Sequence, residues 1–272
     1  MDDESGIDDV EERDIEDVEF EPAKEAAEIQ GVDEEIIDKV KTGIPGFDGL
    51  IGGGFERKSV IIITGAAGSG KSILALQFLY NGASLFNEPS LYITFEEDKS
   101  SVYKHALNFG WDFKRLEDEK KFLFMSYPPH EVDRFISEGS VIEDVVREYG
   151  IQRLVMDSIT SFMLLYENEY RRRQVFLKTM EVLRRWGCTT LLTSEGTATE
   201  QGEVKTRFGV EYLADGLISI HIIKKGDSKE LAIEIEKLRG IAHERKLNQM
   251  KITGTGIEIY PTKPVLDESN SY

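Results

Sequence analysis

"ITGAAGSGKSIL", residues 63–74, follows the apolar run "SVIIIT" and precedes a helical pattern. Its motif is Gly65, four further residues, then Gly70, Lys71 and Ser72. This is the phosphate-binding P-loop pattern, in the strand, loop and helix context that it requires. Glycines let backbone N–H groups turn toward phosphate oxygens, and a helix N-terminus favours negative charge. The stretch therefore predicts a nucleotide-phosphate site on an α/β fold.

The side chains of this loop have separate expected roles. Lys71 is expected to reach the β- and γ-phosphates and to assist catalysis, while the Ser72 hydroxyl ligates Mg²⁺. The alternative is a glycine-rich turn that binds nothing. The residues expected to bind the nucleotide here are Gly65, Ala66, Ala67, Gly68, Ser69, Gly70, Lys71 and Ser72.

A second metal-binding residue follows another apolar run. "RLVMDS" ends in Asp157, the form of a Walker B strand. A carboxylate at the tip of a buried strand is costly unless a cation or a donor satisfies it. Asp157 is therefore the predicted partner of Ser72 around Mg²⁺, with a simple capping aspartate as the alternative.

Two adjacent acids, Glu96 and Glu97, end the run "LYITFEE". The carboxyl ends of parallel strands line the ligand crevice of such sheets. One of these glutamates is expected to polarise a water for attack on the γ-phosphate. The alternative is that both acids begin the next helix, where its first turn favours negative charge.

Apolar runs alternate with helical patterns through most of the chain. Such alternation indicates a mostly parallel sheet covered by helices on both faces. The expected strands are 59–64, 90–95, 121–127, 152–157 and 189–194, and the expected helices are 71–85, 100–109, 132–150 and 168–186.

The end of the chain has a different pattern. Four strand-like segments joined by short turns, from 215 to 261, predict an antiparallel extension of the sheet. We expect one domain at 36–262, a tail at 1–35 and a C-terminal tail at 263–272, with a short helix leading in from Val32.

The acidic charge is concentrated at the N-terminus. Residues 1–40 carry 18 Asp and Glu against 3 Lys and Arg, a net charge of −15, whereas the whole chain carries −18. Such a self-repelling segment is expected to be disordered; it could serve solubility, dock on a basic partner or screen a site from nucleic acid.

Cys188 is the single cysteine, which excludes a disulfide framework. No membrane-length apolar run or signal-peptide pattern is present. A cytoplasmic protein is expected.

The motifs together resemble the KaiC-type branch of the RecA-like ATPases, from about Val40 to Pro261. The resemblance rests on the ordered segments "TGIPGFDGLIGGGF", "GAAGSGKS", "FLYNGA", "YITFEED", "FGWD", "MDSITS" and "EKLRGIAH". It implies an ATPase that cleaves the β–γ phosphoanhydride of ATP with Mg²⁺ and forms a homo-oligomeric ring, commonly a hexamer, with nucleotide between subunits.

The resemblance also implies roles for individual residues. It supports Glu96 and Glu97 as the water-activating pair. It assigns Lys237 and Arg239, which strand alternation would place on one side of their strand, to the neighbouring subunit's half of the site. Leu238, His243 and Asn108 match positions near the base or sugar. The alternative is that Lys237 and Arg239 are surface charges on an exposed strand with no part in the site.

Some features depart from the family's pattern. The clock protein of the KaiC-type branch has two such ATPase domains in tandem, whereas this chain has one. At the positions where the second domain of the clock protein phosphorylates itself, this chain has Glu211 and Tyr212 instead. The resemblance is therefore to the ATPase half of the clock protein, and self-phosphorylation at that place is not expected. Gly254 replaces an acid often found near the base, which leaves base selectivity open.

Two rival functions stay open, a non-hydrolysing ATP-binding scaffold and a DNA-repair accessory ATPase. The second would use the arginines of the 168–186 helix, although a solvated helix face is the more common role of such runs. An unidentified protein partner is expected to read the nucleotide state, and no membrane partner is expected.

Overall fold

The computed structural model describes residues 38–127, 139–198, 204–206, 209, 211–241, 243 and 245–264. The acidic tail at 1–35 and the short helix from Val32 therefore lie outside the described residues, and so does the C-terminal tail beyond Pro264. The first two residues of that expected tail, 263 and 264, end the last strand.

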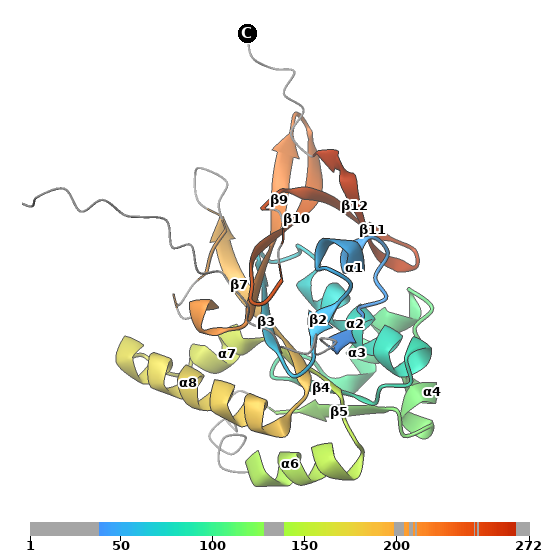
Figure 1. Ribbon diagram of the computed structural model, residues 1–272, viewed down its shortest axis with the longest axis vertical. Coiled ribbons are helices and arrows are strands. Elements are labelled where there is room, and N and C mark those ends of the chain that lie inside the picture. Colours follow the sequence, from blue (N-terminus) through green and yellow to red (C-terminus); the bar gives the residue numbers. More distant parts are fainter. Residues whose placement is uncertain are drawn as a thin grey trace, which may run out of the picture. The chain divides into compact units, whose positions relative to one another are not determined.

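A ten-stranded sheet forms the centre of the described residues, in the order β12-β11-β10-β9-β3-β7-β6-β4-β5, with β8 paired to β7 (Figure 1). Neighbouring strands from β9 to β5 run parallel, which confirms the predicted parallel core. With β9, its strands are β3 (Val60–Gly65), β4 (Ser90–Thr94), β5 (Phe122–Ser126), β6 (Arg153–Asp157) and β7 (Thr189–Ala198). The short strand β8 (Val204–Thr206) pairs antiparallel with β7.

The C-terminal extension joins the core through β9 (Gly216–Lys225), which runs parallel to β3. From β9 outward the pairing is antiparallel, through β10 (Ser228–Leu238), β11 (Asn248–Thr253) and β12 (Gly256–Pro264). The predicted extension is confirmed. A separate two-stranded ribbon pairs β1 (Lys39–Val40) with β2 (Phe55–Glu56).

Helices cover both faces of the sheet (Figure 1). One face packs against α2 (Lys71–Leu85), α3 (Lys99–Leu107) and α4 (Phe113–Asp118), and the other against α6 (Gly139–Glu148), α7 (Ile159–Met163) and α8 (Glu169–Trp186). Short helical turns also occur at α1 (Phe47–Leu50) and η2 (Glu211–Leu213). Among the described residues, no helix has the length and apolar composition needed to cross a membrane.

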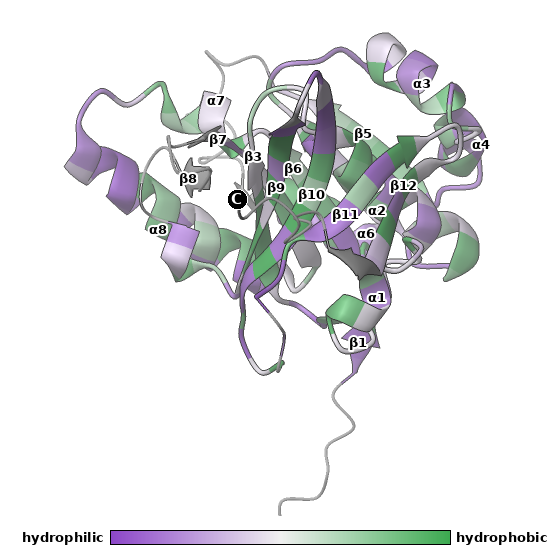
Figure 2. Ribbon diagram, turned by 90° about the horizontal axis from the view of Figure 1, so that it is seen from above, coloured by the Kyte–Doolittle hydropathy of each residue, from purple (hydrophilic) through white to green (hydrophobic). Residues whose placement is uncertain are grey.

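Alternation along β3 divides the core into two layers. Ile61 and Ile63 pack on the α2 side, while Val60 and Ile62 pack on the α8 side, and all four are fully buried. Figure 2 shows the corresponding hydrophobic colour along the central strands between α8 and α2. A strand that is apolar on both faces forms a rigid base for the loop that follows it.

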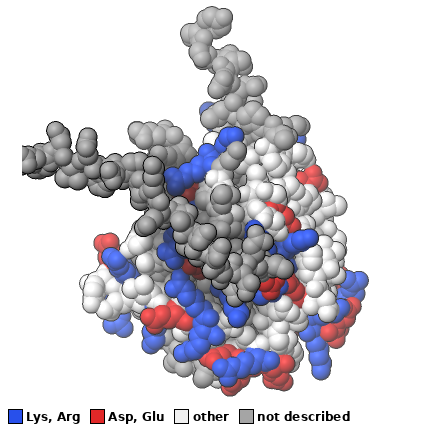
Figure 3. All heavy atoms as spheres, in the orientation of Figure 1, with Lys and Arg blue, Asp and Glu red and all other residues white. Residues whose placement is uncertain are grey.

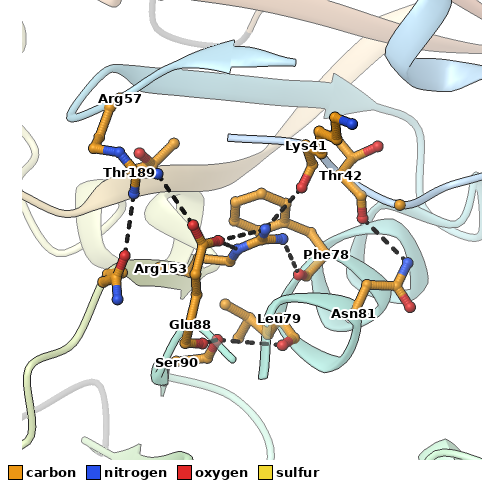
Figure 4. Close-up of polar contacts among 12 residues, drawn as sticks. Lys41, Thr42, Arg57, Phe78, Leu79, Asn81, Glu88, Ser90, Arg153 and Thr189 are labelled. Carbon is orange, nitrogen blue, oxygen red and sulfur yellow. Dashed lines mark hydrogen bonds and ion pairs between the residues drawn. The ribbon is translucent and has the colours of Figure 1, made fainter. Parts of the chain in front are cut away.

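A buried arginine fixes the opposite end of α2. The Arg153 side chain is fully buried at the start of β6 and donates to Glu88, to the Phe78 carbonyl at 2.9 Å and to the Lys41 carbonyl at 2.7 Å (Figure 4). Because the charge is paired and hydrogen-bonded, its burial is tolerated. A Cβ at Gly82 would lie 2.3 Å from the Arg153 side chain, so this close approach requires glycine.

Candidate active site

The loop between β3 and α2 has a backbone that requires glycine at two points. Gly68 and Gly70 have φ values of 78° and 95°, in the left-handed region that other residues rarely adopt. Ser69 N–H closes the turn on the Ala66 carbonyl at 3.1 Å, and α2 begins directly after Gly70. The loop thus presents the start of a long helix at the carboxyl edge of the parallel strands, the position of an anion site.

Lys71 lies across this loop. Its amine donates to the carbonyls of Gly65 and Ala66, each at 2.9 Å. Burial lowers the pKa of Lys71, while the negative charges of Glu195, Asp157 and Glu96 act in the opposite direction. The fold therefore brings three carboxylates from separate segments to the amine.

Asp157 ends β6 and is 8% exposed. Its Oδ2 accepts a hydrogen bond from the Tyr92 hydroxyl at 2.8 Å, and its Oδ1 accepts one from Thr193. Sequence reasoning found the carboxylate but missed both donors. Burial and the neighbouring Asp157 raise the pKa of Tyr92 well above its ordinary value, so this phenol keeps its proton at neutral pH and donates a hydrogen bond to Asp157.

Glu96 and Glu97 follow β4 and precede α3. Asp98, not either glutamate, caps α3 by accepting from the Ser101 N–H at 3.0 Å, so the helix-start alternative is wrong. The Glu96 carboxylate accepts from the hydroxyls of Ser158, at 2.7 Å, and Ser161, which hold it beside α7.

Glu97 has different surroundings. Its carboxylate lies 3.8 Å from Nδ1 of His105, and its side chain is 42% exposed. Burial first, and then the charge of Asp157, raise the pKa of Glu97. A carboxylate with a raised pKa is a stronger base, so Glu97 is a candidate acceptor of the water proton.

Oxygen donors dominate the candidate metal position. Ser72 lies at the start of α2 and Asp157 at the end of β6, and a hydroxyl with a carboxylate suits Mg²⁺, which keeps several waters. Within the described ranges, no group of three or more His, Cys, Asp or Glu side chains forms another metal cluster. The residues present fit magnesium held through phosphate.

Lys237 and Arg239 lie away from this loop in the same chain. Lys237 pairs with Leu217 and donates to the carbonyls of Tyr212, at 2.6 Å, and Ala214, at 2.7 Å. Arg239 contacts Asp215 at 3.3 Å, where Asp215 caps the start of β3. Through Leu217, Lys237 is level with Ile62 of β3, about 10 Å from Gly65 at the usual strand rise, whereas Asp215 is level with Val60, about 16 Å from Gly65.

The two basic residues do lie near each other. Burial lowers the pKa of Lys237, and the charge of Arg239 adds to that effect. Simple strand alternation does not explain this proximity, because β10 ends at Leu238 and its register shifts between Ile235 and Lys237. They gather instead because both lie beside Asp215.

The residues expected near the base or sugar are scattered in a single chain. Leu238 is buried in the core beside Gly216, and Asn108 is exposed at the end of α3. His243 Nδ1 lies 3.0 Å from the Ile241 carbonyl. The structure does not bring these three to the loop at 65–72.

A hairpin that sequence reasoning did not place beside the loop lies there. A Cβ at Gly70 would be 3.1 Å from Ile252 of β11, and Gln77 of α2 bonds Ile257 of β12 in both directions, at 2.7 and 3.2 Å. The turn of this hairpin contains Gly254. Only long-range sheet pairing reveals this neighbour.

The arginines of α8 have partners within the chain. Arg184 contacts Asp215 at 3.3 Å, Arg185 contacts Glu143 at 3.0 Å, and Arg173 donates to the Tyr212 hydroxyl at 2.7 Å. In Figure 3, blue spheres in the region of α8 are interspersed with red ones. This mixed surface resembles a solvated helix face more than a nucleic-acid site.

Comparison with known proteins gives a consistent family. The family model "ATPase: KaiC" matches residues 40–264. The circadian clock oscillator protein KaiC of Nostoc sp. is 34% identical over 246 residues, covering 88% of this chain but 47% of that protein. The chain therefore spans about half the length of the clock proteins it matches.

Archaeal relatives are matched over nearly their whole length. A UPF0273 protein of Methanocaldococcus jannaschii is 32% identical over 241 residues, which are 83% of this chain and 97% of that protein. The crystal structure of a KaiC-like protein from Pyrococcus horikoshii superimposes with a TM-score of 0.74 at 36% identity, covering 83% of this chain and all of that one. This chain belongs to the KaiC family of RecA-like, ATP-binding ATPases.

Proposed function

We propose that the loop at 65–72 binds Mg²⁺·ATP and that Glu96 and Glu97 direct its hydrolysis at the β–γ bond. The observation that carries this proposal is the position of Lys71, whose amine crosses the loop within the electrostatic reach of Asp157 and Glu96. A cation at the phosphate position with acids just beyond it is the charge order that phosphoryl transfer to water needs.

Each part of the site has a distinct task in this mechanism. Backbone N–H groups of the loop and the amine of Lys71 hold the phosphates, and Lys71 exchanges its two carbonyl acceptors for phosphate oxygens. Ser72 and Asp157 would hold Mg²⁺, which when bound neutralises charge on the β- and γ-phosphates. Glu96 and Glu97 orient a water molecule and accept its proton.

A second copy of the chain completes the site in this proposal. Lys237 is level with Ile62, about 10 Å along the sheet from Gly65, and Asp215, the partner of Arg239, is level with Val60, about 16 Å away. Both basic side chains have partners at that level, so we expect them to serve another copy's nucleotide. A head-to-tail contact of this kind closes into a ring when the rotation permits, and a hexamer is our expectation. ATP at the seam favours assembly because it binds the ring better than separated chains.

The output of such a ring is proposed to be regulatory. We expect hydrolysis in the ring to be slow. The ATP-bound state would then persist long enough for a cytoplasmic protein partner to recognise it. Intact acids at 96 and 97 argue against a non-hydrolysing scaffold, and the paired α8 arginines argue against DNA as the effector.

Phosphate release tests the proposed function. Purified protein with saturating Mg²⁺·ATP is expected to release phosphate at a rate that EDTA abolishes and DNA leaves unchanged, and to elute from a sizing column as a larger species with ATP than without. ATP binding without phosphate release would support the scaffold instead. Stimulation by single- or double-stranded DNA would support a DNA-dependent ATPase.

A further inference from the structure

A tyrosine outside the predicted site contacts its metal-type carboxylate. Tyr92 lies on β4 and is 1% exposed, and its hydroxyl donates to Oδ2 of Asp157 at 2.8 Å. In the register of β4 against β6, Tyr92 is opposite Val155 and Thr94 is opposite Asp157. The Tyr92 side chain therefore begins two residues before the level of Asp157, on the same face of the sheet. The length of the tyrosine side chain lets its hydroxyl reach the carboxylate.

Aromatic packing fixes the direction of this phenol. The Tyr92 ring lies 5.6 Å from the ring of Phe124, its neighbour in register on β5, and Phe124 in turn packs against Tyr103 of α3 at 6.0 Å. Tyr92 is also part of the hydrophobic core on the α2 side of the sheet. A ring held in this way has little freedom to point its hydroxyl elsewhere.

The Asp157 carboxylate accepts hydrogen bonds from residues of both strands that flank β6. Tyr92 of β4 binds one oxygen and Thr193 of β7 binds the other. Each carboxylate oxygen accepts about two hydrogen bonds, so each retains capacity for a metal ion or its water. Asp157 is nearly buried, and a carboxylate that has lost one of these donors could rotate away from that orientation.

We propose that Tyr92 is a positioning residue that orients Asp157 for the magnesium of the bound nucleotide. This inference rests on the proposed Mg²⁺·ATP site. Partners that hydrogen-bond a metal ligand typically contribute about 10- to 100-fold to metal affinity. Removal of the Tyr92 hydroxyl should therefore weaken magnesium binding while leaving the phosphate loop intact.

The test is Tyr92→Phe, which keeps the ring and removes one oxygen. Binding of a non-hydrolysable ATP analogue to the full chain is titrated against Mg²⁺ concentration and measured again in EDTA. The half-saturating Mg²⁺ concentration is expected to rise about 10- to 100-fold, with binding in EDTA unchanged. Thr193→Val, which removes the donor to the other oxygen, is expected to shift the Mg²⁺ titration in the same direction.

Tyr103→Phe is the matched control, because it removes another buried hydroxyl next to Phe124, on α3. It should leave the titration unchanged. If Tyr92 had only a structural role, Tyr92→Phe would lower the melting temperature and weaken analogue binding in EDTA. The half-saturating Mg²⁺ concentration would then stay at the wild-type value. A wild-type midpoint in Tyr92→Phe would overturn this inference alone. Absence of any Mg²⁺ effect in the wild-type protein would overturn the proposed function, and this inference with it.

Discussion

Replacement of both Glu96 and Glu97 by glutamine is expected to leave ATP bound and to slow its hydrolysis by about 10²- to 10⁴-fold. An amide cannot accept the proton of the attacking water at neutral pH. It can still accept hydrogen bonds, so the contacts that Ser158 and Ser161 make with residue 96 survive. The phosphate loop does not contain either position, so nucleotide affinity should be retained.

Single-turnover phosphate release, with ATP binding measured on the same sample, checks this expectation. The matched control is Glu117→Gln with Glu119→Gln, which removes the same charge from ion pairs around α4. The control should hydrolyse ATP at the wild-type rate. Near-normal turnover in the Glu96 and Glu97 variant would assign water activation to another residue.

The Lys71→Ala variant is expected to bind ATP about 100-fold more weakly. Charge-assisted hydrogen bonds contribute about 1.5–3 kcal/mol each, and about 1.4 kcal/mol corresponds to tenfold in affinity. Two bonds to phosphate would suggest a larger loss, but Lys71 must first leave the carbonyls of Gly65 and Ala66. The expected net effect is therefore smaller than the sum.

Calorimetric titration with Mg²⁺·ATP measures this loss. Lys114→Ala removes an exposed lysine that is paired with Asp118 on α4, and it should bind ATP as the wild type does. If Lys71→Ala also kept the wild-type affinity, the loop at 65–72 would not be the phosphate site.

The sequence predicted the elements around the P-loop well because local signals agreed there. The helix expected at 71–85 begins and ends where α2 does, since glycine positions, periodicity and the following turn all indicate the same limits. The expected strand at 189–194 was too short. β7 continues to Ala198 because it pairs with β8, a contact that no local pattern records.

The charged residues of the candidate site could be predicted from the sequence, but the residues that hydrogen-bond to them could not. Asp157 ends β6 and Glu96 follows β4 by two residues, positions that pattern alone can locate. Tyr92 and Thr193 contact Asp157 only because β4 and β7 both flank β6, an order set by the helical crossovers of the whole sheet. Arg153 likewise looked like an ordinary strand residue until the fold placed it against Glu88.

The same limit applies to the basic pair. Strand alternation suggested that Lys237 and Arg239 share a side, but the strand ends between them. Their proximity depends on Asp215, whose backbone and side chain join the start of β3 to the segment after β10. Such a contact arises from tertiary structure and leaves no periodic signal.

The central claim is that one chain supplies the phosphate loop and another supplies Lys237 and Arg239. Mixing two inactive proteins, Lys71→Ala and the double variant Lys237→Ala with Arg239→Ala, tests it most directly by phosphate release. After subunit exchange, about one quarter of the seams in an equal, randomly assembled ring should have both halves intact, and activity should return to a similar fraction of the wild type. Freely exchanging subunits that regain no activity, or a dilute monomer that hydrolyses ATP at the full rate, would contradict the claim.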